Sequence, residues 1–108
     1  MDKYATLYPK LKYFFSAYFH QDWKSFYDLR KEDSIYQVVV RDFKTNNPRE
    51  TIEQASKELD KLLSLDLSET DLGEIIVHQL GANIHAPGTD LTYRQWAQAV
   101  LDNLRESL

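Results

Sequence analysis

The chain has 108 residues, a net charge of −4 and no cysteine. Its length fits one domain over residues 1–108, able to bury a core without covalent staples. The missing cysteines exclude disulfides, thiolate nucleophiles and cysteine-based metal sites. The acidic balance disfavours nucleic acid as a direct partner, since that needs a basic surface. No apolar run could span a bilayer and no signal peptide opens the sequence, so we expect a cytoplasmic protein without a membrane partner.

The first predicted helix covers residues 8–19. Its apolar side chains recur every three or four residues, at Leu11, Phe14, Phe15, Tyr18 and Phe19. Pro9 suits the first turn, where its missing N–H costs nothing. Residues 21–33 are less regular and leave room for a helical turn or two.

The second predicted helix begins after a cap at Asp33 or Ser34. Ile35, Val38, Val39 and Phe43 give it an apolar stripe. Its three adjacent valines would also suit a strand. We favour the helix, because the helical spacing continues to Phe43.

Three further helices follow, each with its own start signal. The third runs from Pro48 to about Asp66, with Asn47 as the expected cap and Glu50 completing a capping box. The fourth follows Ser68 and ends at Gly81, a natural residue after a helix C-terminus. The fifth opens on Thr92 and Gln95, which form a second capping box. Because glycine and proline are scarce, the sequence predicts an all-α fold, a compact bundle of about five helices.

No motif for catalysis or cofactor binding is present. The histidines His20, His78 and His85 lack metal-ligand spacing, and no phosphate-binding loop or activated nucleophile is evident. His20 and Asp22 lie two residues apart, which would suit a metal or an acid–base pair in a small hydrolase. We favour a structural role, in which His20 meets the negative end of a helix dipole and Asp22 caps the next turn. We therefore expect neither enzymatic activity nor a cofactor.

Residues 50–74 are the only strongly charged stretch, with eight acidic and two basic side chains, a net charge of −6. Pairs such as Glu53 with Lys57 and Glu58 with Lys61 have the spacing for exposed ion pairs along a helix. Such pairs would neutralise only part of the negative charge of this stretch. The remaining carboxylates would attract a basic partner. Tyr13 lies outside the apolar face of its predicted helix, so it is a better candidate for a surface contact than the aromatic residues of that face.

The sequence also resembles a known family. The resemblance is carried by Tyr8-Pro9-Lys10-Leu11, Phe14-Phe15 and Tyr18-Phe19-His20-Gln21-Asp22-Trp23, and later by Leu80-Gly81 and by Leu91-Thr92-Tyr93-Arg94-Gln95-Trp96. Immunity proteins of bacterial contact-dependent growth inhibition open with a similar pattern, Y-P-x-L, F-F and then Y-F-H-Q-D-W. We expect Phe19, His20, Gln21, Asp22 and Trp23 to be a structural motif, with Trp23 buried and Asp22 capping a helix.

The resemblance implies a function. In the cytoplasm, such proteins bind a toxin domain that forms the C-terminal part of a surface-displayed effector. The resemblance therefore implies that this chain forms a one-to-one complex with its toxin domain. The toxins are often nucleases, so we expect a nuclease, and an RNase first. The five side chains that we expect to face the toxin are Glu53, Asp60, Glu69, Asp71 and Glu74. The alternative is a helical adaptor or regulatory domain with another protein partner.

Overall fold

The structure, a computed structural model, describes residues 3–19, 35–82 and 92–106. These ranges contain six α-helices and no strand. The helices are α1 (Lys3–Leu7), α2 (Pro9–Tyr18), α4 (Ile35–Asn46), α5 (Arg49–Ser64), α6 (Glu69–Glu74) and α7 (Tyr93–Arg105), and a π-helical segment, η1 (Ile75–Gln79), continues α6. The all-α prediction is confirmed, and the three valines lie in a helix rather than a strand. The short helix α1 was not predicted.

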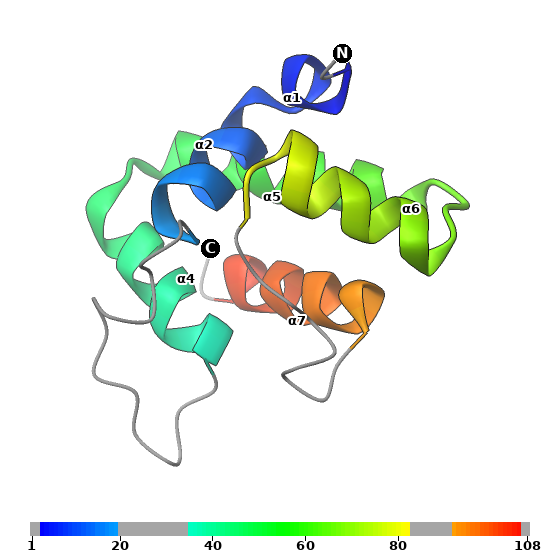
Figure 1. Cartoon of the computed structure of the whole chain (residues 1–108). Coiled ribbons are helices and arrows are strands. Elements are labelled where there is room, and N and C mark those ends of the chain that lie inside the picture. Colours follow the sequence, from blue (N-terminus) through cyan, green and yellow to red (C-terminus); the bar gives the residue numbers. More distant parts are fainter. Residues whose placement is uncertain (1–2, 20–34, 83–91, 107–108) are drawn as a thin grey trace.

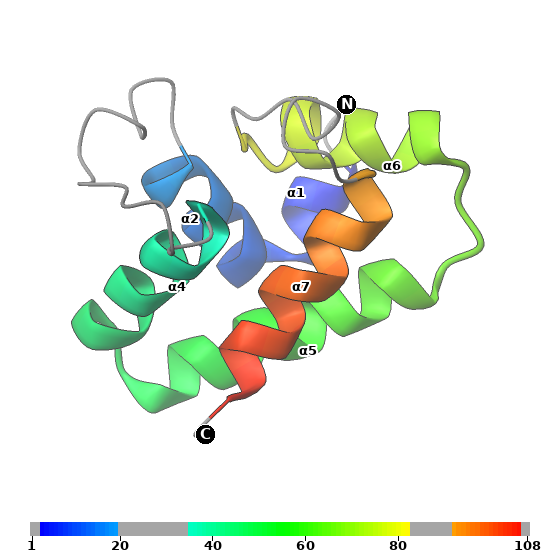
Figure 2. The same ribbon diagram turned by 90° about the horizontal axis from the view of Figure 1, so that it is seen from below.

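Helix α7 contacts three other helices. It packs against α5, α4 and α6, while α2 packs against α5 and α4, and α1 packs against α2 and η1. Figures 1 and 2 show α7 lying across both α5 and α6 on one side of the molecule. None of the helices in the three described ranges is long and apolar enough to cross a bilayer.

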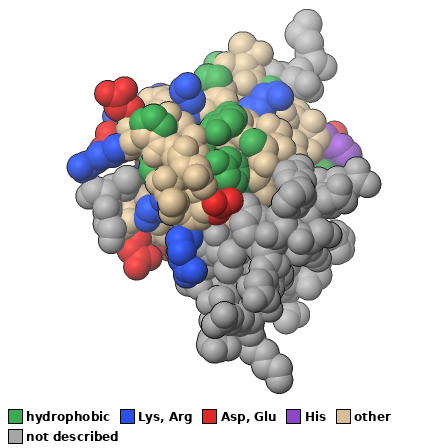
Figure 3. Space-filling model, turned by 90° about the vertical axis from the view of Figure 1, so that its left-hand side faces the viewer, with side chains coloured by type: hydrophobic (Ala, Val, Ile, Leu, Met, Phe, Trp, Pro, Cys, Tyr) green, Lys and Arg blue, Asp and Glu red, His purple; other side chains and the backbone are tan. Residues whose placement is uncertain are grey.

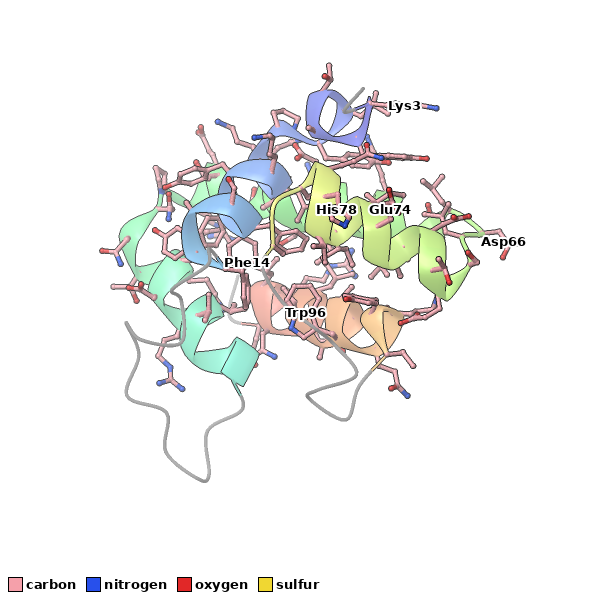
Figure 4. All side chains as sticks on the ribbon, viewed as in Figure 1. Lys3, Phe14, Asp66, Glu74, His78 and Trp96 are labelled. Carbon is pink, nitrogen blue, oxygen red and sulfur yellow. The ribbon has the colours of Figure 1, made fainter. Side chains whose placement is uncertain are left out.

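Aromatic rings from α2 and the residue that ends it, from α4 and from α7 form the centre of the core. Phe14 stacks on Phe43 with ring centroids 4.2 Å apart, and Phe15 and Phe19 contact Trp96 at 5.4 and 5.1 Å. All five side chains are buried, and Figure 4 shows Phe14 and Trp96 inside the molecule. Around these rings pack buried leucines and isoleucines of the helices, among them Leu11, Leu59, Leu62, Leu72, Ile76, Leu101 and Leu104.

Several predicted helix ends are confirmed. The Ser68 side chain accepts a bond of 3.1 Å from the backbone N–H of Asp71, and Thr92 and Gln95 form the capping box at the start of α7. Gly81 adopts φ +83°, where a side chain would be strained. It also lies against α2, because a Cβ there would stand 2.9 Å from Cβ of Ser16. The turn after η1 therefore needs glycine.

The predicted cap of α5 is wrong. Pro48, not Asn47, precedes the first helical residue, and no side chain caps this end. The Asn47 amide instead donates a bond of 2.8 Å to the Phe43 carbonyl, which closes the last turn of α4. Because the Asn47 amide bonds the end of α4, this side chain does not cap α5, although the sequence pattern favoured that cap.

Candidate functional site

Two of the five carboxylates expected at the interface, Glu53 and Asp60, lie on α5. The Glu53 carboxylate accepts a bond of 2.8 Å from Nε of Arg49, and the expected ion pair with Lys57 does not occur within the described part of the chain. Oδ2 of Asp60 lies 3.3 Å from Nη2 of Arg105 on α7. Exposed pairs of this kind contribute at most about 1 kcal/mol to stability. They do, however, cancel much of the local negative charge on this side of the molecule.

The other three carboxylates share the short helix α6. The carboxylate of Glu69 accepts the backbone N–H of Tyr93 and, at 3.3 Å, that of Arg94. It therefore caps the start of α7, where the first N–H groups have no acceptor within the helix and the helix dipole favours a negative charge. Asp71 and Glu74 are exposed, and no ion pair to either occurs within the described part of the chain.

Helix α7 divides these five carboxylates into two groups. Glu69 lies at its first turn and Asp60 at its last, and thirteen helical residues separate these ends by about 18 Å. The structure thus places Glu69, Asp71 and Glu74 on one short helix, α6, and Glu53 and Asp60 on another, α5. Figure 4 shows Asp66, a further acidic side chain, at the outer end of the connection between α5 and α6, beyond Glu74.

Sequence reasoning missed the role of Glu58. Its side chain is 3% exposed, and the expected surface pair with Lys61 is wrong. Oε1 instead accepts the backbone N–H of Leu11 at 2.9 Å, and Oε2 accepts a bond of 2.9 Å from the side-chain amide of Gln54. Glu58 therefore caps α2 from another helix. Its partner lies 47 residues away in sequence, so no local pattern could have indicated this bond.

Arg94 is the second residue whose role was missed. Its guanidinium donates bonds of 3.1 Å each to the carbonyls of Leu63 and Leu67. Arg94 thus holds the connection between α5 and α6, while Glu69 holds the start of α7. We call these two side chains, with the backbone groups that they bind, the Glu69–Arg94 clamp.

Tyr13 lies on a different face of the molecule, formed by α2 and α4. It is 43% exposed, as predicted for a surface residue. Its hydroxyl donates to Oδ1 of Asn47 at 3.0 Å, and the Asn47 amide donates to the Tyr18 hydroxyl at 3.0 Å. Burial raises the pKa of Tyr18 above its ordinary value. Figure 3 shows hydrophobic side chains gathered in the upper centre of the view, with both basic and acidic side chains around them.

The predicted motif from Phe19 to Trp23 is described only at its first residue. Phe19 is fully buried against Trp96. The other four residues of the motif, with the predicted burial of Trp23 and cap by Asp22, lie outside the described ranges, as does His85. His78 is exposed on η1 (Figure 4). In the described ranges, no group of three or more His, Asp or Glu side chains is placed to hold a metal ion.

Comparisons with known proteins agree with the sequence resemblance. The family model of the CdiI immunity protein matches residues 7–104. The structure is similar to a chain of the CdiA-CT/CdiI complex from Y. kristensenii 33638, with a TM-score of 0.77 and 22% sequence identity over 91% of this chain and 98% of that chain. A comparison with curated proteins finds no match. Because the family model spans from the end of α1 to the last turn of α7, the chain belongs to the CdiI immunity protein family.

Proposed function

We propose that this protein is an immunity protein that binds the C-terminal toxin domain of a contact-dependent growth inhibition effector and neutralises it in the cytoplasm of the producing cell. The observation that carries the proposal is the match to the CdiI family over residues 7–104. The similarity in fold to a chain from a CdiA-CT/CdiI complex supports it. The partner is one toxin domain per immunity protein, and inhibition needs no catalytic step by this chain.

The exposed carboxylates support a basic toxin, and a nuclease is the expected class, an RNase first. A nuclease must attract a polyanion, so the surface around its active site carries positive charge. Asp71 and Glu74 are exposed without an ion pair in the described ranges and could attract such a surface. Electrostatic attraction of this kind mainly raises the association rate.

We propose unequal roles for the five carboxylates of the expected contact. Asp71 and Glu74 face the toxin directly, and Glu69 acts beside them while capping α7. Glu53 and Asp60 lie at the margin, where Arg49 and Arg105 reduce their effect on the partner. If this side of the molecule does not meet the toxin, the contact remains to be sought at the face that carries Tyr13 and Tyr18 or within residues 82–91, of which the structure describes only Ala82.

A titration tests the proposed function and separates it from catalysis. The toxin domain encoded directly upstream of this gene is purified, and its activity is measured with increasing amounts of this protein. We expect activity to fall in a straight line and reach zero at one equivalent, with a one-to-one complex in light scattering. Co-expression should also protect cells from the toxin.

Two results would contradict the proposal. If a small fraction of an equivalent abolished all toxin activity, the protein would be acting as an enzyme. If no complex formed and cells were not protected, the adaptor alternative would replace the immunity function. An unrelated toxin domain of similar charge serves as the control and should remain fully active.

A further inference from the structure

The Glu69–Arg94 clamp joins two segments in both directions. The Arg94 guanidinium holds the carbonyls of Leu63 and Leu67, at the end of α5 and in the connection that follows. The Glu69 carboxylate, two residues after Leu67, holds the backbone N–H groups that open α7. Each segment thus supplies one charged side chain to the backbone of the other.

The N-terminal end of α6 is held by this contact with α7. The four-residue connection from Leu65 to Ser68 has no regular structure, so the chain there does not by itself fix the direction of α6. Apart from its continuation η1, the main packing partner of α6 is α7. The approach is close, because a Cβ on Gly73 would stand 2.7 Å from the Tyr93 ring. Because η1 fixes the C-terminal end of α6, the first turn of α7 mainly positions its N-terminal end.

We infer that the Glu69–Arg94 clamp is a positioning device for the toxin contact, holding Asp71 and Glu74 in their binding arrangement before the toxin arrives. The inference rests on the proposed function. A surface that is ordered in advance loses less entropy on binding and so binds more tightly. The planar guanidinium of Arg94 bonds two carbonyls at once, whereas a lysine ammonium is a single point charge on a flexible stem.

The matched variants are Arg94→Lys and Arg105→Lys. Both keep the net charge, and both change an arginine of α7, but Arg105 pairs with Asp60 at the opposite end of the helix. In the free protein, we expect amide hydrogen exchange over residues 66–74 to accelerate about tenfold or more in Arg94→Lys. The same amides should exchange at the parent's rate in Arg105→Lys. Glu69→Gln is the second clamp variant, used if Arg94→Lys does not fold.

A double-mutant cycle then connects the clamp to binding. The pair Asp71→Asn and Glu74→Gln is introduced into the parent, into Arg94→Lys and into Arg105→Lys, and the dissociation constant for the toxin domain is measured. We expect the pair to weaken binding in the parent and in Arg105→Lys by the same factor. In Arg94→Lys that factor should be smaller by about threefold or more, since the carboxylates are already misplaced.

The results separate the clamp from the function. If exchange over residues 66–74 is unchanged, or if the cycle is additive, the positioning role is wrong although the toxin complex stands. If the pair has no effect in the parent, Asp71 and Glu74 do not meet the toxin and the clamp positions no contact. If the parent forms no complex, the proposed function is wrong, and the clamp cannot position a toxin contact. Hydrogen exchange still decides in that case whether the clamp orders α6.

Discussion

Carboxylates of one acidic stretch serve two different purposes in this molecule. Glu58 and Glu69 accept backbone N–H groups of α2 and α7 and so join helices that are distant in sequence. Asp71 and Glu74 make no such bond to another helix within the described residues. The net charge of −6 over residues 50–74 therefore overstates the charge that is available to a partner. Part of it stabilises the fold, and the remainder is free to act at the surface.

The largest effect in this comparison is expected at Glu58. Replacing it in Glu58→Ala leaves the buried N–H of Leu11 without an acceptor and removes a negative charge from the start of α2. We expect the free energy of unfolding to fall by about 2–3 kcal/mol. Urea denaturation followed by circular dichroism measures this loss. Lys61→Ala, on the exposed side of the same helix, should change stability by less than about 0.5 kcal/mol. Equal stability of the two variants would show that the buried bond contributes nothing.

A smaller effect is expected at Glu69. The carboxylate of Glu69 is exposed, and Thr92 and Gln95, which lie at the start of α7, already cap the same helix end. We therefore expect Glu69→Ala to lower the free energy of unfolding by about 1 kcal/mol, the ordinary value for losing a cap. The comparison is Glu74→Ala, another exposed glutamate of α6, in the same denaturation experiment. If both variants lose the same amount, Glu69 acts as a surface charge and not as a cap.

The fold was largely predictable because its signals are local. The stripes that contain Phe14 and Phe43 follow helical spacing, and Ser68 and Thr92 cap the helices that they precede in sequence. Helix α1 was missed, since five residues carry too little periodicity to distinguish a helix from an irregular start. The cap at Asn47 failed because the residue can serve either of two neighbouring helices, and only the packing of α2 against α4 and α5 decides between them.

The candidate site was predictable only in part. The sequence showed the acidic surplus, but it could not show which carboxylates would bind backbone groups of another helix. The partners of Glu58 and Glu69 are backbone groups 47 and 24 residues away, and backbone N–H groups leave no mark in a sequence. The pair of Asp60 with Arg105 likewise depends on how α7 crosses α5. The resemblance indicated the family, whereas the division of the carboxylates required the structure.

The association rate with the toxin domain tests the surface role of Asp71 and Glu74 most directly. The double variant Asp71→Asn, Glu74→Gln is compared with Glu53→Gln, Asp60→Asn, which removes the same charge from residues that already have arginine partners. Both should stay within about 0.5 kcal/mol of the parent in stability, as exposed substitutions do. We expect the first variant to associate several-fold more slowly at low ionic strength, and its association rate should depend less on salt concentration. The association rate of the second variant should fall much less. Association of the first variant at the parent's rate at every ionic strength would contradict the account.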